Sequence, residues 1–175
     1  IEPETDESRN GLWVTAWAQD WPTDGIDLYV GVDALSARFV TQVHTPSLTG
    51  LLKSDLPAGP EGRWDRASKL QMSLYSGQMS HRDRLDVLNG ANRFAVQTSE
   101  GWEVLQAQYA ELTNPGEWRL STLLRGQGGT PRVGAVLGSP VVVLNGQGVV
   151  LKLREEERDT PLQLFAIPAG HNLDD

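Results

Sequence analysis

The sequence predicts a mainly β protein, built as antiparallel sandwich or barrel-like lobes with one short helix. Short alternating apolar runs, separated by turn residues, recur along the chain. Asn114-Pro115-Gly116 and Asn145-Gly146 are typical hairpin turns, because proline presets φ and Gly or Asn accepts a positive φ. The chain has 175 residues, of which 39% are hydrophobic, and this is enough for one domain or two small lobes.

The first part of the chain predicts a small β lobe over residues 11–57, after an acidic linker over residues 1–10. Two prolines and two glycines in residues 56–62 mark the expected boundary with a larger β domain over residues 58–175. One continuous domain over residues 11–175 is the alternative. The strands expected in the first lobe cover residues 12–18, 26–33, 37–44 and 49–56.

The larger domain continues with alternating runs and a single helix. The helix is expected within residues 80–90, capped by Ser80 and ended by Gly90, with Leu85 and Leu88 on one docked face. Asn145-Gly146 predicts a hairpin within residues 141–153. The remaining strands are expected over residues 68–75, 93–98, 102–112, 118–124 and 161–170.

The charge of the chain excludes several classes of function. The formal net charge is -8, the isoelectric point is about 4.8, and the 15 basic residues are scattered. Nucleic acid binding needs clustered Lys and Arg, so we expect no nucleic acid partner. We also expect no membrane insertion, since no apolar run approaches about 20 residues. The chain has no cysteine, which excludes disulfides and a cysteine nucleophile. It starts at Ile1 without a methionine, so we expect it to be a segment of a longer polypeptide.

No catalytic or metal-binding constellation is evident, and we expect no enzyme activity, catalytic residue, cofactor or metal. The three histidines, His44, His81 and His171, lack the spacing of paired ligands. Asp24, Asp27 and Asp33 miss the spacing of a calcium loop, so we expect a solvated loop there. The run of glutamates at residues 155–157 predicts a solvated bend.

The glycine-rich stretch after residue 125 raises the question of phosphate binding. A phosphate loop needs a lysine and a following helix, whereas this stretch has no lysine and continues into Pro131. We therefore predict a structural turn that binds no nucleotide. Arg125, which follows two leucines, is expected to pair with a carboxylate or with loop carbonyls through its planar guanidinium group.

The tryptophans leave two interpretations open. Trp13, Trp17 and Trp21 are four residues apart, and in a strand this spacing would place them on one face. They could form an exposed platform for a sugar, or they could pack in a core or between lobes. The candidate glycan or partner contacts are Trp13, Trp17, Trp21 and Trp64.

One long stretch resembles a known protein family. Residues 100–130, "EGWEVLQAQYAELTNPGEWRLSTLLRGQGGT", resemble the C-terminal region of the large baseplate hub protein, or megatron protein, of gene transfer agents and related long-tailed phages. Ala107 stands where the family usually has phenylalanine, and we expect neighbouring Tyr109 to compensate. The motif residues that we expect to have structural roles are Trp102, Glu103, Gln106, Pro115, Gly116, Arg125, Gly126, Gly129 and Thr130.

The resemblance implies a structural part of a tail tip. Its partners would be other segments of the same hub protein and neighbouring tail-tip proteins, and it would take part in attachment to the host. Its location would be the tail tip of a virion or virus-like particle made in the bacterial cytoplasm. The alternative is a carbohydrate-binding module that recognises a cell-envelope glycan. An envelope-degrading hydrolase is a third and weaker reading.

Overall fold

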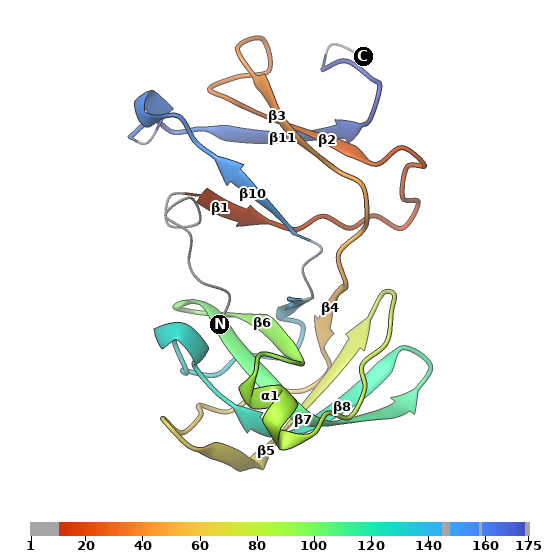
Figure 1. The fold of residues 1–175 in the computed structure, drawn as a ribbon, viewed down its shortest axis with the longest axis vertical. Helices are drawn as coiled ribbons and strands as arrows, with labels where there is room; N and C mark the ends of the chain where they lie inside the picture. The colour runs from red at the N-terminus through yellow and green to blue at the C-terminus, as the bar shows by residue number, and fades with distance from the viewer. Residues whose placement is uncertain (1–10, 145–147, 158, 174–175) are drawn as a thin grey trace. The chain divides into compact units, whose positions relative to one another are not determined.

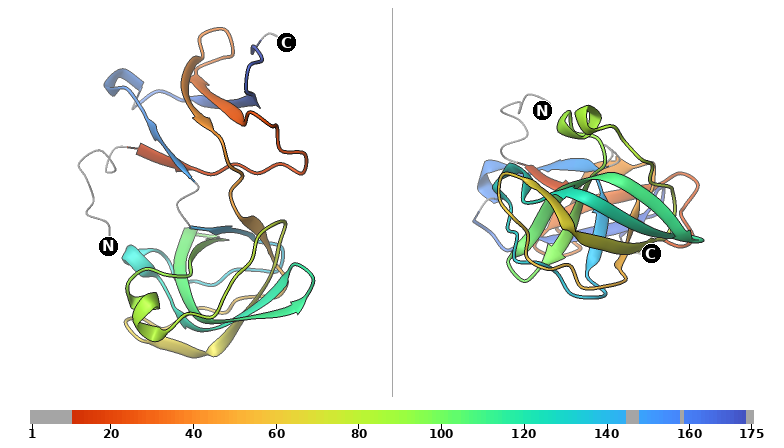
Figure 2. Two further views of the ribbon diagram at one scale, coloured as in Figure 1. Left: turned by 45° about the vertical axis from the view of Figure 1, so that its right-hand side comes forward. Right: turned by 90° about the horizontal axis from the view of Figure 1, so that it is seen from below.

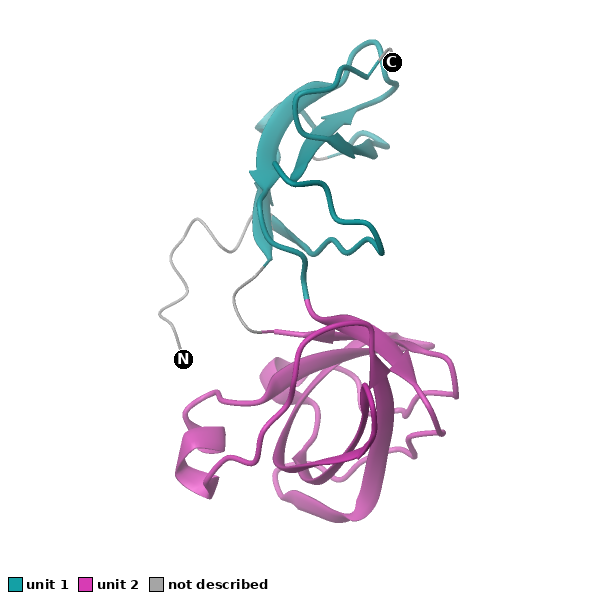
Figure 3. Ribbon diagram, turned by 90° about the vertical axis from the view of Figure 1, so that its right-hand side faces the viewer, with its two compact units in different colours: residues 1–47, 147–175 teal, residues 48–146 magenta. Residues whose placement is uncertain are grey.

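The computed structural model describes residues 11–144, 148–157 and 159–173. It is mainly β, as predicted, with one short α-helix. The chain divides into two compact units, shown in Figure 3. Unit 1 comprises Ile1–Ser47 and Gln147–Asp175, and unit 2 comprises Leu48–Gly146.

Unit 2 is a closed barrel of six antiparallel strands (Figures 1 and 2). The order around the barrel is β4-β5-β8-β7-β6-β9, and β9 pairs with β4 to close it. Closure leaves no unpaired sheet edge, so every strand has two neighbours. The strands are β4 (Thr49–Leu52), β5 (Trp64–Leu74), β6 (Arg93–Thr98), β7 (Gly101–Asn114), β8 (Glu117–Leu124) and β9 (Pro140–Val143).

The hairpin between β7 and β8 follows the turn chemistry of its sequence. Asn114 pairs with Glu117 across the turn, and Pro115 and Gly116 form its tip. Gly116 has a φ of 74°. This is the positive φ that glycine at the third position of a type II turn supplies, so the predicted turn is confirmed.

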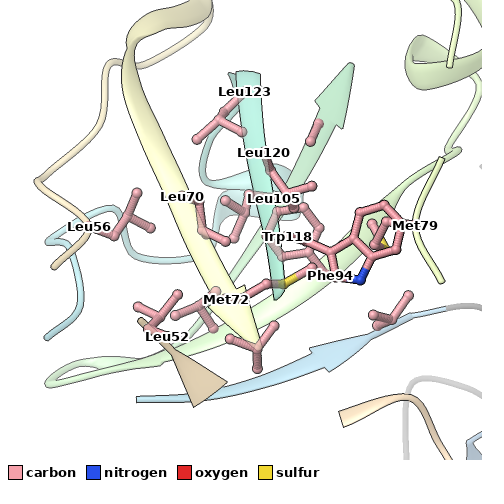
Figure 4. Packing of buried hydrophobic residues seen from close by; sticks show 14 of the residues in the cluster. Leu52, Leu56, Leu70, Met72, Met79, Phe94, Leu105, Trp118, Leu120 and Leu123 are labelled. Carbon is pink, nitrogen blue, oxygen red and sulfur yellow. The ribbon is translucent and has the colours of Figure 1, made fainter. Parts of the chain in front are cut away.

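The barrel interior is filled by apolar side chains from all six strands, and Figure 4 shows most of them. In β5 the alternation of Leu70, Met72 and Leu74 buries all three, as predicted. Phe94 is completely buried in β6, and Leu120 in β8. Each such side chain stabilises the fold by about 1.5–3 kcal/mol through burial alone.

The inward side of β8 changes along its length. Trp118 and Leu120 face the core, and so does Leu123, although it lies three positions after Leu120 and regular alternation would turn it outward. Thr122, between them, has a φ of 56°, which breaks the strict alternation of the strand. Ser121 comes directly after Leu120 and lies on the outside of the barrel, as does Tyr109, which pairs with it on β7.

Helix α1 (Arg84–Leu88) lies inside the predicted range but differs from the prediction in two respects. The capping position is Asp83 rather than Ser80, whose carbonyl instead accepts a hydrogen bond from Asn92. Leu85 and Leu88 are exposed, whereas Val87 is completely buried. The helix is too short to dock through a leucine stripe. The described helices include none that is long and apolar enough to cross a membrane.

Unit 1 consists of two small antiparallel sheets. One has the order β11-β2-β3 and the other pairs β1 with β10. Its core is a small cluster of Leu28, Val30, Val43 and Leu151, with partly buried apolar side chains around it. The strands are β1 (Gly11–Val14), β2 (Ile26–Gly31), β3 (Arg38–Val43), β10 (Val149–Lys152) and β11 (Gln163–Pro168).

The division of the chain differs from a boundary near residue 57, and also from a continuous domain over residues 11–175. β4 belongs to the barrel because it pairs with β5 and β9. β10 and β11 return to unit 1 because they pair with β1 and β2. Pairing between distant strands therefore decides the division, and the Pro/Gly-rich segment lies within unit 2.

The prediction of a hairpin around Asn145-Gly146 is wrong. These two residues lie outside the described residues, but the strands on either side do not pair with each other. β9 pairs with β4 and β6, whereas β10 pairs with β1. The local turn signal is overridden by partners that lie far away in the sequence.

Candidate functional site

The centre of the family-like motif is a buried cluster of charged groups. Arg125 follows β8, and Glu103 lies on the neighbouring strand β7. The Nε of Arg125 donates to Oε1 of Glu103 at 2.6 Å, and its Nη2 donates to Oε2 at 2.8 Å. Both side chains have no exposed surface. This is a two-point pair of planar groups, which fixes orientation as well as distance.

Two further acceptors complete the surroundings of Arg125. Its Nη1 donates to Oδ2 of Asp65 on β5 at 3.2 Å, and its Nη2 donates to the carbonyl of Pro57 at 3.0 Å. The expectation that Arg125 pairs with a carboxylate or a loop carbonyl is confirmed on both counts. The cluster therefore ties β5, β7, the end of β8 and the segment before β5 to one another.

Asp65 joins the cluster at an irregularity in β5. The register with β8 shifts between Asp65 and Lys69. In this bend Oδ1 of Asp65 accepts from the backbone N–H groups of Ala67 at 3.1 Å and Ser68 at 2.9 Å. Burial alone would raise the pKa of Asp65, but the hydrogen bonds from Ser68, Arg125 and Ala67 outweigh it and lower that pKa.

The glycine-rich turn is held onto the same cluster. Gly126 is left-handed, with φ 57° and ψ 40°, and its N–H donates to Oε1 of Glu103 at 3.2 Å. The hydroxyl of Thr130 donates to the carbonyl of Gln127 at 3.0 Å and accepts from the N–H of Val104 at 2.9 Å. Hydrogen bonds to Glu103 and Val104 therefore fix the turn to β7.

A shallow groove of about 710 Å³ runs beside this turn. Arg132 and Glu61 border it and form a salt bridge of 3.0 Å between Nη2 and Oε2. The hydrogen bond between them, reinforced by charge attraction, raises the pKa of Arg132 and lowers that of Glu61. Arg125 has its charge engaged by two carboxylates, so it offers no free cation for a phosphate in the groove. The absence of nucleotide binding stays a prediction.

Comparison with protein families identifies the part of the chain that carries this cluster. The model described as "Rcc01698-like, C-terminal" matches residues 47–142, which is the barrel of unit 2 up to β9. The chain belongs to the Rcc01698-like C-terminal family. Rcc01698 is a gene transfer agent protein, so the family-level association agrees with the resemblance. No curated protein matches the chain.

Gln106, another motif residue of this Rcc01698-like domain, anchors the short helix. It lies on β7, is buried, and donates through Nε2 to the carbonyls of Val87 and Ala91. Val87 lies in the last turn of the helix, where its carbonyl also accepts from the N–H of Gly90, and Ala91 follows the helix. Docking of α1 therefore depends on an amide side chain, which a search for apolar stripes does not find.

The expectation that Tyr109 compensates for the small side chain of Ala107 is wrong. Ala107 is completely buried in the barrel, at the position where the family usually has phenylalanine. Tyr109, two residues later, is half-exposed on the outside of the barrel. The alternation of β7 breaks between Ala107 and Tyr109, opposite Thr122, whose φ is 56°.

Of the two interpretations of the tryptophans, the structure does not support the exposed platform. The first strand ends at Val14, so only Trp13 lies on it, and equal parity does not place Trp17 and Trp21 beside it. Trp21 packs against the core of unit 1, and its Nε1 donates to the carbonyl of His44 at 3.3 Å. Trp17 is partly buried as well.

The tryptophans of unit 2 occupy three different settings. Trp64 is partly buried, with the guanidinium carbon of Arg84 5.4 Å from its ring centroid. Trp102 is exposed near the turn between β6 and β7. Trp118 is buried, and its indole N–H has no hydrogen-bond partner within the described part of the chain. These positions favour packing over a common binding face.

The acidic segments have local structural roles. Asp33 accepts from the N–H of Ser36 at 2.8 Å and from its hydroxyl at 2.6 Å, and these bonds lower its pKa. The glutamates at residues 155–157 form a 3₁₀ turn, η3 (Glu155–Glu157), rather than only a solvated bend. Across residues 11–144, 148–157 and 159–173, no group of three or more His, Cys, Asp or Glu residues is placed to hold a metal ion.

Glu157 forms the main ion pair of unit 1. The Nε and Nη2 of Arg38 donate to its two oxygens at 2.8 and 2.6 Å, and the N–H of Arg154 adds a third bond at 2.7 Å. The bonds from Arg38 lower the pKa of Glu157 to about 2, with help from Arg154. Sequence reasoning missed this pair because its members lie 119 residues apart.

Proposed function

We propose that the chain is a structural segment of the tail-tip hub of a gene transfer agent or a related long-tailed phage. It acts by assembly with other segments of its parent hub and with neighbouring tail-tip proteins. It is located at the tail tip of a particle assembled in the bacterial cytoplasm. The observation that carries the proposal is membership of the Rcc01698-like C-terminal family over residues 47–142.

The geometry of the motif supports a structural role. Arg125, Glu103 and Thr130 direct their polar atoms to one another and to nearby backbone. A catalytic group needs access to a substrate, and a completely buried ion pair has none. The motif therefore holds β5, β7 and the end of β8 together, and we assign contact with partners to the exposed surface.

A candidate assembly surface lies on the segment between the motif turn and β9. Val133, Val136 and Leu137 are exposed there, and we call these three side chains the apolar loop patch. The segment is held in place by a backbone bridge between Leu56 and Ala135, and by a bond of 2.7 Å from the N–H of Leu137 to Asp55. A fixed, exposed apolar surface is typical of a docking site for another protein.

The assembly role is tested in the parent particle. We expect Val136→Asp combined with Leu137→Asp to reduce the number of complete tails counted by electron microscopy. Leu35→Asp is the control, since Leu35 is exposed in unit 1, outside the patch. Normal tails with both patch substitutions present would show that the apolar loop patch is not needed for tail assembly.

The absence of catalysis is tested on the purified chain. It is incubated with peptidoglycan and with envelope polysaccharide, and released fragments are sought by mass spectrometry. We expect none. Turnover that disappears on replacement of a single Asp or Glu would make the chain an envelope-degrading enzyme and end the structural proposal.

A further inference from the structure

The outside of the barrel carries a second groove that the hub role leaves unused. It has a volume of about 580 Å³ and lies across β5, β8 and β7. Strand register places Lys69, Ser121 and Tyr109 side by side in one row. Arg119 and Glu111 form the next row and also line the groove. Because three paired strands position these side chains, the groove is preorganised.

One wall of the groove is aromatic. The rings of His81 and Tyr109 stack with centroids 4.9 Å apart and an angle of 30° between their planes. Both are about half-exposed, although ring surface is ordinarily buried. The C–H face of a pyranose ring packs on such a surface while its hydroxyls reach polar neighbours. The hydroxyls of Ser121 and Tyr109, together with the carboxylate of Glu111, supply those neighbours.

The groove carries two cations, Lys69 and Arg119, and one carboxylate, Glu111. Lys69 makes no ion pair within the described residues, and it is exposed at the groove. Arg119 is 3.5 Å from Glu111, measured from Nε to Oε2, and both side chains remain accessible to solvent. Lys69 and the solvent-accessible Arg119, beside an aromatic wall, favour a ligand with a carboxylate on a ring.

We propose that this groove binds an acidic polysaccharide, with a uronic acid ring against Tyr109 and its carboxylate directed to Lys69 and Arg119. The site goes beyond the hub role and does not depend on it. It also differs from the tryptophan surface that the sequence suggested. Single-stranded nucleic acid fits less well, because it requires cations along a track of several phosphates, and the groove has two.

The test is calorimetric titration of the intact chain with oligomers of galacturonate, glucuronate-containing hyaluronan and mannuronate. Maltohexaose is the neutral control and single-stranded DNA the polyanion control. We expect binding to at least one acidic oligosaccharide and to neither control. Tyr109→Ala and Lys69→Gln should each weaken that binding by tenfold or more.

Matched substitutions outside the groove distinguish a loss of binding at the groove from a general effect of changing the surface. Tyr75→Ala is the control for Tyr109→Ala, because both tyrosines are 48% exposed and Tyr75 does not line the groove. Lys53→Gln is the charge control. Failure to bind any acidic oligosaccharide, equal binding to DNA, or equal losses from the controls would overturn the inference. Tail counts in the parent carrying Tyr109→Ala report on the hub proposal separately, and we expect them to stay normal.

Discussion

The two units differ in the arrangement of their sheets and in the size of their buried cores. Unit 2 closes its sheet into a barrel, so no edge is left open and the interior is filled from all six strands. Unit 1 keeps two small sheets and a small buried cluster centred on Leu28, Val30, Val43 and Leu151. The family match falls on the barrel. Closure therefore accompanies the part of the chain that carries the family motif.

The contrast is clearest in the two arginine–glutamate pairs. Arg125 and Glu103 in unit 2 have no exposed surface, whereas Arg38 and Glu157 in unit 1 are 23% and 14% exposed. The contact geometry is nearly the same in both pairs. A buried charge that loses its partner cannot be rescued by water, but a partly exposed one can. We therefore infer that burial, rather than contact geometry, sets how much free energy of unfolding is lost when one of these pairs is broken.

The largest expected effect comes from breaking the buried pair. Arg125→Ala leaves Glu103 and Asp65 buried without their cation, so we expect a loss of about 3–5 kcal/mol in the free energy of unfolding of unit 2. Chemical denaturation followed by fluorescence of the tryptophans measures it. Arg38→Ala is the matched control and should cost much less. Equal losses for the two substitutions would contradict the role given to burial.

A smaller effect is expected from crowding the buried guanidinium. A Cβ added at Gly59 would lie 2.7 Å from the side chain of Arg125. Gly59→Ala should therefore cost about 1–3 kcal/mol through overpacking. A double-mutant cycle tests the cause, because the same change should cost little once Arg125→Ala has removed the clashing atoms. Additive losses would show that the strain lies elsewhere.

Low pH should destabilise unit 1 by protonating Glu157. Its pKa falls from an ordinary 4.5 to about 2 on folding, so the unfolded state binds the proton more readily. The resulting stabilisation is present above about pH 4.5 and is lost as the pH falls towards 2. Amide hydrogen exchange in β3 and β10 measures this loss. Glu157→Gln should remove the dependence in that window, and its persistence would assign the effect to another carboxylate.

The smallest effect is expected at Trp118. Its indole N–H is buried without a partner among the described residues, and such a donor costs about 1–3 kcal/mol. Trp118→Phe removes that cost along with part of the apolar surface. We expect a net change of about 1 kcal/mol or less, measured by thermal unfolding. Phe94→Ala, which removes an apolar ring and no donor, is the contrasting variant and should cost about 3–5 kcal/mol.

Local features of this fold follow from the sequence. The strand over residues 93–98 has its predicted bounds, and the Pro115-Gly116 turn has the expected positive φ. Alternation and turn chemistry depend on a few neighbouring residues, so strands and turns of this kind can be predicted from the sequence. The need of Arg125 for a carboxylate also follows from its place after two leucines, because a buried cation must have a partner.

Features that depend on distant pairing do not follow from the sequence. Asp65 lies 60 residues from Arg125, and β11 lies far along the chain from β2. The groove proposed to bind a polysaccharide depends on the register of three strands, β5, β8 and β7. No local pattern encodes which of many acidic residues will meet an arginine, or which side of a strand a bend will turn outward.

The most direct test of the central claim removes the barrel from its parent. Residues 48–146 are deleted, and assembled tails and cell attachment are counted by electron microscopy. We expect particles whose tails are incomplete at the tip or fail to attach, because the barrel acts by assembly. Normal tails with normal attachment to cells would contradict this claim.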